Sequence, residues 1–66
     1  MSHIIIRLPE VMRRTGLSRS TIYLHMSKGH FPKSVSLGER AIGWVEIDVE
    51  QWLDERITEA KAINNE

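Results

Sequence analysis

Cysteine is absent from this 66-residue chain. A disulfide scaffold, a cysteine-ligated zinc finger and a thiol nucleophile are therefore excluded together. Long apolar runs are missing as well, since a run such as Ile4–Ile6 is far shorter than the ~20 residues that cross a bilayer. The start of the chain lacks the basic region and apolar stretch of a signal peptide, and we expect a cytoplasmic protein with no membrane partner.

Aromatic residues are scarce, with two tryptophans, one tyrosine and one phenylalanine, so each is expected to anchor packing or binding. Apolar residues make up 41% of the chain and charged residues 27%, a mixture typical of a globular protein rather than a disordered one. A chain of this length buries only ~60% of the surface that its unfolded form exposes, so the core is expected to be thin. No repeat or linker divides the sequence. We expect one domain over residues 1–66, with a core at about 7–56 and a helical tail at 57–66.

Net charge is also absent, because nine basic residues balance nine acidic ones. The charges are nevertheless segregated along the chain: residues 1–45 carry a net +5 and residues 46–66 a net −5. Such asymmetry favours a polyanion as the partner of the first two-thirds, with the C-terminal element turned away from it. The charges alone leave open the alternative in which both sets simply face solvent.

Two short helices are expected before residue 30. The first contains Pro9 in its opening turn and ends at Gly16, which suits a left-handed cap. Its apolar positions recur at helical spacing and leave Arg13 and Arg14 on the open side. Ser18 is a good N-cap for the second helix. The short junction between the helices is typical of a helix-turn-helix pattern, although an ordinary corner between two helices has the same spacing.

Extended structure is expected in two regions. Residues 4–7 form a short β segment. Residues 34–37 and 41–44 alternate with period two across a turn at 38–40, which predicts a small hairpin with a cationic tip. The expected fold class is therefore mainly α with a small β-hairpin, in a three-helix winged helix-turn-helix arrangement.

A third helix is expected to begin with Asp48 as its N-cap and with a hydrophobic staple between Ile47 and Trp52. Its apolar stripe continues toward the C-terminus but is interrupted by Arg56. The side chains expected inside the domain are Ile22, Met26, Val35, Leu37, Trp44, Trp52 and Leu53.

The second helix presents a polar N-terminal end that suits DNA. Arg19, Ser20 and Thr21 can reach phosphates and base edges in a major groove, where short hydroxyl side chains allow close approach. The hairpin that follows supplies Lys33 and Arg40 as a basic wing.

Five stretches of the chain carry a family resemblance: Arg7–Val11, Thr15–Tyr23, Gly29–Lys33, Leu37–Trp44 and Trp52–Leu53. Taken in order, they resemble the AlpA-type prophage regulators, whose winged helix-turn-helix domains are related to phage excisionases and to MerR regulators. The resemblance implies activation of prophage integrase or excisionase genes, and a wing at residues 38–40. It implies recognition of DNA by Arg19, Ser20, Thr21, Tyr23 and the residue at position 24. That position is commonly basic in the family and is Leu24 here, which changes the expected base preference but not the binding mode.

The complete set of candidate DNA-binding residues is Arg19, Ser20, Thr21, Tyr23, Leu24, Lys28, Lys33 and Arg40. Tyr23 has two open interpretations, because its ring can pack in the domain while its hydroxyl reaches a phosphate. Other chemistry is not expected. His25 and His30 lie across the end of a helix, a poor geometry for metal ligands. Since nothing resembles a phosphate loop or a nucleophile with its base, we expect no enzyme, metal or cofactor.

The leading interpretation is a sequence-specific regulator that binds double-stranded DNA. Two alternatives are an architectural, excisionase-like factor that bends DNA beside a recombinase, and a module whose acidic third helix binds RNA polymerase, an integrase or a toxin. One small module covers only ~600–1,000 Å² and contacts few phosphates. We therefore also expect weak self-association through residues 57–63 and cooperative occupation of DNA.

Overall fold

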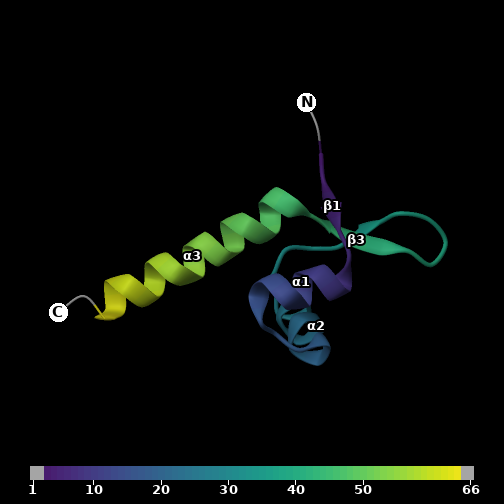
Figure 1. The fold of residues 1–66 in the computed structure, drawn as a ribbon. Coiled ribbons are helices and arrows are strands. Elements are labelled where there is room, and N and C mark those ends of the chain that lie inside the picture. The colour runs from purple at the N-terminus through teal and green to yellow at the C-terminus, as the bar shows by residue number, and fades with distance from the viewer. Residues whose placement is uncertain (1–2, 65–66) are drawn as a thin grey trace.

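The computed structural model describes residues 3–64, which form three helices and three short strands (Figure 1). In chain order the elements are β1 (Ile5–Ile6), α1 (Leu8–Thr15), α2 (Arg19–Ser27), β2 (Val35–Ser36), β3 (Ile42–Val45) and α3 (Glu46–Asn64). The expected class, mainly α with a small antiparallel sheet, is confirmed and is consistent with a winged-helix-like domain.

The junction between α1 and α2 forms as its sequence predicts. Gly16 caps α1 in the left-handed region, with φ of 74°, and its backbone N–H donates to the carbonyl of Met12 at 2.8 Å. Ser18 then caps α2, because its Oγ accepts a hydrogen bond from the backbone N–H of Thr21 at 3.3 Å. One glycine and one hydroxyl therefore produce the helix-turn-helix corner.

Strand β3 lies at the centre of the sheet, whose order is β1-β3-β2 with antiparallel pairing on both sides. The pairing of β2 with β3 is the expected hairpin. Strand β1 pairs with the other edge of β3, where Ile5 lies opposite Val45 and Ile6 opposite Trp44. The backbone N–H of Glu46 donates to the carbonyl of Ile4 at 2.8 Å and extends this pairing to the first residue of α3.

The expectation that Val35 and Leu37 are buried is wrong, since they are 38% and 44% exposed. The register explains the error. Val35 lies opposite Gly43, and directly opposed residues share a face of the sheet. Trp44 is one residue further along β3 and points to the other face, which the helices cover. Leu37, two residues after Val35, follows Val35 to the open face.

The core forms between the covered face of the sheet and the helices. Its buried side chains are Ile6, Val11, Ile22, Phe31, Trp44 and Val49. Ile22 and Trp44 confirm the sequence prediction, and Met26, Trp52 and Leu53 pack partly buried against this cluster.

Helix α3 begins at Glu46, immediately after β3, so the expected N-cap at Asp48 is wrong. The staple between Ile47 and Trp52 is also wrong, because Ile47 is 62% exposed. The chain passes from Val45, the last residue of β3, directly into Glu46, whose N–H is bonded to Ile4, so no connecting segment precedes the helix. Glu46 and Asp48 lie in the first turn, where the helix dipole favours acidic side chains.

Helix α3 runs beyond the body of the domain, on the side away from the hairpin (Figure 1). Residues 54–62 of this helix are all exposed. In the part of the chain from residue 3 to residue 64, no helix has the combination of length and apolar character that a membrane crossing needs.

Replacing Trp44 by alanine is expected to lower the free energy of unfolding by ~3–5 kcal/mol, since the ring is fully buried and its removal leaves a cavity. Urea unfolding followed by circular dichroism measures this loss. Ile47→Ala is the matched control on an exposed side chain and should change stability by less than ~0.5 kcal/mol. An unchanged unfolding curve for Trp44→Ala would contradict the packing described above.

Candidate nucleic-acid interface

One side of α2 is open to solvent and carries several of the candidate residues. Ser20, Tyr23 and Lys28 are exposed, and Leu24 is 51% exposed. Ile22 and Met26 hold the opposite side of the helix against the core. The structure therefore brings these candidates together on a surface that protein does not cover.

The N-terminal end of α2 is a small network of hydroxyl groups. Ser18 Oγ lies 2.8 Å from Thr21 Oγ1 and 3.4 Å from Ser20 Oγ. Thr21 is only partly exposed and shares its hydroxyl with the cap, whereas Ser20 and Arg19 are fully open. The first turn thus offers backbone N–H groups, hydroxyls and one guanidinium to an anionic partner.

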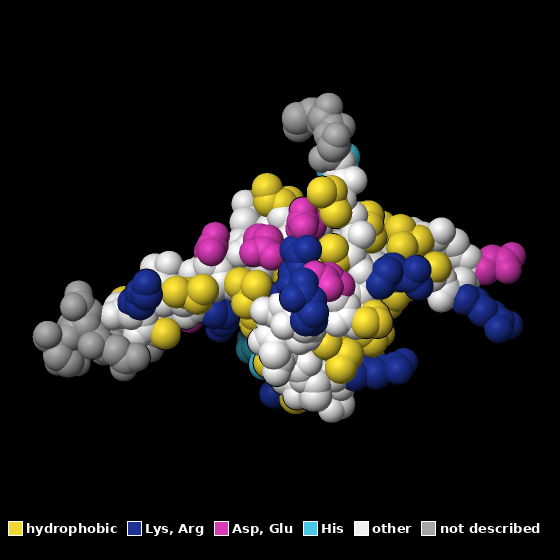
Figure 2. All heavy atoms as spheres, viewed as in Figure 1, with side chains coloured by type: hydrophobic (Ala, Val, Ile, Leu, Met, Phe, Trp, Pro, Cys, Tyr) yellow, Lys and Arg dark blue, Asp and Glu magenta, His cyan; other side chains and the backbone are white. Residues whose placement is uncertain are grey.

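The wing is the second basic feature. Its turn is closed by a hydrogen bond from the Leu37 N–H to the Ala41 carbonyl at 2.7 Å. Arg40 is exposed at the tip beside the equally exposed Glu39. Figure 2 shows dark blue and magenta side chains together at that end of the molecule. Glu39 and Arg40 together give the tip no net charge. Arg40 acts as a cation toward DNA when its side chain extends away from Glu39.

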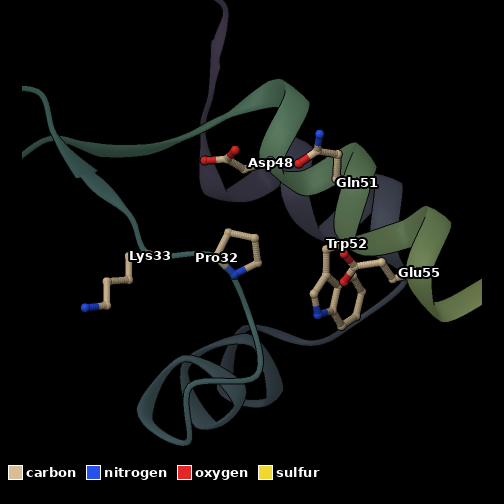
Figure 3. A pocket seen from close by; sticks show the side chains of 6 residues that line it. All are labelled: Pro32, Lys33, Asp48, Gln51, Trp52 and Glu55. Carbon is tan, nitrogen blue, oxygen red and sulfur yellow. The ribbon is translucent and has the colours of Figure 1, made fainter.

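An open groove of about 350 Å³ separates the loop before β2 from α3 (Figure 3). Its lining residues are Pro32, Lys33, Asp48, Gln51, Trp52 and Glu55. Lys33 stands on the loop side, and the carboxylates of Asp48 and Glu55 stand on the helix side. Because those carboxylates repel phosphate, Lys33 can reach a DNA backbone only from outside the groove.

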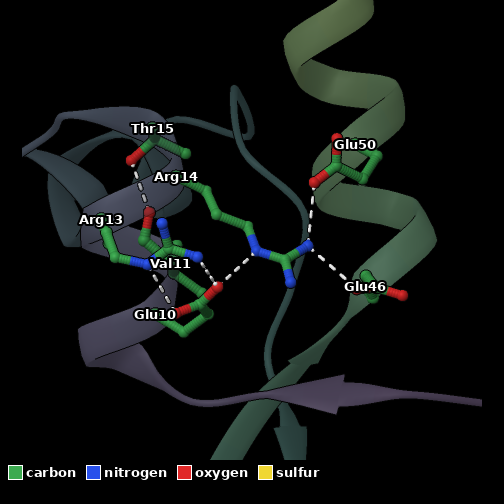
Figure 4. A network of polar contacts seen from close by, with 7 residues as sticks. All are labelled: Glu10, Val11, Arg13, Arg14, Thr15, Glu46 and Glu50. Atoms are coloured by element: carbon green, nitrogen blue, oxygen red, sulfur yellow. Dashed lines mark hydrogen bonds and ion pairs between the residues drawn. The ribbon is translucent and has the colours of Figure 1, made fainter.

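Arg14 does not lie free on the open side of α1, as the sequence led us to expect. Its guanidinium forms ion pairs with Glu10 at 2.7 Å and with both Glu46 and Glu50 of α3 at 2.9 Å (Figure 4). Arg13 also donates to Glu10, at 2.9 Å. Two bases of the basic region are thus paired with acids of the same chain: Arg13 at the surface of α1, and Arg14 between α1 and α3.

The spacing of these charges contained a signal that the sequence analysis missed. Glu10 precedes Arg13 by three residues and Arg14 by four, the separations at which side chains meet on a helix. Hydrogen bonds from Arg13 and Arg14 lower the pKa of Glu10 from 4.5 to about 2. The bond to Glu10, followed by those to Glu46 and Glu50, raises the pKa of Arg14 above its ordinary value.

Five bases in residues 1–45 keep their charge available to a partner. Within residues 3–64 they are exposed and form no ion pair: Arg7, Arg19, Lys28, Lys33 and Arg40. Four of the five are candidate DNA-binding residues, on α2, the loop and the wing.

The two histidines pack rather than converge on a ligand. The ring centroids of His25 and His30 are 6.5 Å apart, and the His25 ring lies 6.4 Å from that of Trp52. Among the residues that the structure describes, no group of three or more histidine, aspartate or glutamate side chains is placed to hold a metal ion.

Residues 4–57 match the model of the family described as prophage CP4-57 regulatory protein (AlpA). The chain is 48% identical over 56 residues to the uncharacterized protein ORF88 of Enterobacteria phage P4, a match covering 85% of this chain and 64% of that protein. It is 38% identical over 58 residues to the DNA-binding transcriptional activator AlpA of Escherichia coli (strain K12), covering 79% of this chain and 83% of that protein. The matched region thus spans less than two-thirds of the phage P4 relative.

The lowered pKa of Glu10 predicts a specific acid sensitivity. In the unfolded chain this carboxyl titrates near 4.5, and in the folded protein near 2. Its contribution to stability is therefore complete above about pH 5 and is lost as the pH falls toward 2. Glu10→Gln should be less stable than the wild type at pH 7 and should approach it near pH 2.

Urea midpoints measured at a series of pH values test this expectation. Glu39→Gln removes the same charge from the wing tip, where the carboxylate is exposed, and is the matched control. A Glu10→Gln chain that keeps the full acid-induced loss of the wild type would show that the ion pairs contribute nothing to folding.

Proposed function

Since this chain belongs to the AlpA family of prophage regulatory proteins, we propose that it regulates transcription by binding double-stranded DNA in a sequence-specific manner. The observation that carries the proposal is the open side of α2 with its exposed polar side chains, in a domain whose α2, loop and wing carry four exposed bases that form no ion pair within residues 3–64. The relative from Escherichia coli is named as a DNA-binding activator, which supports the same assignment. The family description is of a regulatory protein and agrees with the expectation that the chain is no enzyme.

In the proposed complex α2 lies in the major groove with its first turn toward the bases. Ser20 and Arg19 reach base edges or phosphates, and Leu24 offers an apolar contact of the kind that recognises a thymine methyl group. Thr21 contributes less freely, because its hydroxyl also belongs to the cap of the helix. Tyr23 is exposed on the same helix, and in the complex its hydroxyl contacts a phosphate.

The remaining contacts position the protein on the DNA backbone. Lys28 and Lys33 stand on either side of the loop after α2, and Arg40 stands at the wing tip. These bases contact phosphates and carry no sequence information. Helix α3, with its excess of acid, leaves the domain on the side away from the wing and so points away from the duplex (Figure 1).

The same proposal covers the genes that the protein regulates and the compartment in which it acts. The family description and the phage P4 relative favour prophage genes, of the integrase or excisionase class, as targets in the cytoplasm. A single domain over residues 1–66, with its core at about 7–56, carries the binding activity. RNA polymerase or a recombinase is the expected protein partner on that DNA.

Selection of bound duplexes from a random library, followed by footprinting, tests the function. We expect one enriched sequence, protected over a single short site. Ser20→Ala and Leu24→Ala should each change the preferred base at one or two positions, since a lost base contact removes ~1–3 kcal/mol of discrimination. Failure to enrich any sequence would overturn the proposal, and sharp bending across tandem sites would indicate an architectural factor instead.

Arg40→Ala should behave differently from the changes on α2. Because Arg40 is assigned to a phosphate, its loss should weaken selected and unselected duplexes by the same factor, roughly tenfold. Competition binding against the selected duplex and its single-base variants measures this factor. A loss confined to one base position would show that the wing reads bases.

Cooperative occupation of DNA is proposed on the protruding part of α3. Ile57 is 51% exposed there, and its neighbours from residue 54 to residue 62 are exposed as well. The expected contact surface, residues 57–63, ends at Ile63, whose side chain lies outside the described residues. The surface is small, so it is expected to act only between copies that one duplex holds close together.

Titration of duplexes with one site or two sites, spaced by about 10 base pairs or multiples of it, tests this contact. We expect tighter binding per site on the double site, and Ile57→Ser should abolish the difference. Ile47→Ser changes another exposed isoleucine, at the other end of α3, and should leave the difference intact. Equal affinity for single and double sites at every spacing would remove the assembly role.

A further inference from the structure

We propose that Trp44 and Trp52 act as positioning residues for DNA binding, because together they fix the loop that sets the wing relative to α2. The inference rests on the proposed function and names the device that lets the two basic surfaces bind one duplex. It concerns the segment His30–Pro32, which we term the Phe31 anchor.

The Phe31 anchor lies in a segment that has no regular structure of its own. Residues 28–34 belong to neither a helix nor a strand, although they join α2 to β2. The backbone N–H groups of Lys28, Gly29 and His30 still donate to the last turns of α2. Beyond them, the geometry of residues 31–34 is set by the side chains that contact the segment.

Two tryptophans hold the anchor from different elements. The indole N–H of Trp52, on α3, donates to the carbonyl of His30 at 2.6 Å. The indole N–H of Trp44, on β3, donates to the carbonyl of Pro32 at 3.1 Å. The carbonyls on both sides of Phe31 are therefore tied to two elements that lie far along the chain.

The ring of Phe31 completes the anchor. It is buried and meets both tryptophan rings edge to face, with centroids 4.9 Å from Trp52 and 6.5 Å from Trp44. The backbone N–H of His30 also donates to the carbonyl of His25, at 2.7 Å, and so links the anchor to the last turns of α2. Three consecutive residues are thus fixed to α2, β3 and α3 together.

The proposed DNA contacts begin immediately outside the anchor. Lys28 precedes it by two residues, and Lys33 follows it directly on the way to the wing. Figure 3 shows Trp52 and Pro32 next to each other, with Lys33 extending from the far side of the loop. A shift of the anchor therefore moves the wing relative to α2, and two surfaces that must bind at once lose affinity when their spacing is wrong.

Trp52→Phe tests this assignment, because phenylalanine keeps an aromatic ring against Phe31 and loses the N–H that reaches His30, together with part of the indole. The measurement is a double-mutant cycle in which Arg40→Ala reports the wing contact with a selected duplex. We expect Arg40→Ala to weaken binding roughly tenfold in the wild type and less than about twofold in the Trp52→Phe background.

Val49→Ala is the control for a loss of stability alone, since Val49 is buried on the same helix and its side chain has no group that can donate to the anchor carbonyls. In that background Arg40→Ala should keep its full effect. The inference would be overturned if Arg40→Ala weakened binding by the same factor in the wild type and in Trp52→Phe. A smaller loss from Arg40→Ala in the Val49→Ala background would overturn it as well. If Trp52→Phe does not fold, Trp44→Phe enters the same cycle with the same expectation.

Hydrogen exchange of the two indole N–H groups gives a second readout on the unaltered protein. Both should exchange slowly before DNA is added, and a rapid exchange of the Trp52 indole would overturn the inference. A wild type that binds no duplex would overturn the proposed function and this inference with it. If the wild type binds the duplex but the effects of Trp52→Phe and Arg40→Ala simply add, only this inference is overturned.

Discussion

Strand β3 has four residues, and both outer strands, α1 and α3 pack directly on it. It pairs with β1 along one edge and with β2 along the other, and it continues into α3 without a connecting residue. Its largest side chain, Trp44, lies under the helices, so the strand joins the sheet to the core as well. A thin core in a small domain has few independent contacts, and here most of them meet on one short segment.

The features that the sequence predicted are those decided within a few residues. Gly16 and Ser18 shape the turn between the first two helices through bonds to neighbours three or four positions away. The turn at residues 38–40 closes in the same local way. Such signals can be read directly, because the partner of each group is already in view in the sequence.

The errors arose where the partner is distant. The burial of Val35 and Leu37 depends on which residue of β3 stands opposite, and a shift of one position exchanges the two faces of a strand. Glu46, the first residue of α3, is bonded to Ile4 at the other end of the domain's sequence. Arg14 is paired with two glutamates more than thirty residues away. The sequence predicted that one side of α2 is open to solvent, and the structure has Ser20 and Leu24 exposed there. The use of this side in binding DNA stays a prediction.

The internal pairing of Arg13 and Arg14 has a consequence for the ions around the protein. Each phosphate that a base neutralises releases part of a condensed counterion, which sets how steeply affinity falls as salt is added. Only five bases of residues 1–45 remain unpaired among the described residues. The logarithm of the binding constant therefore falls with the logarithm of salt concentration no more steeply than about −4.5 per monomer. A protein built in this way depends less on bulk electrostatic attraction, and more on the fit of α2, to distinguish its site from the surrounding DNA.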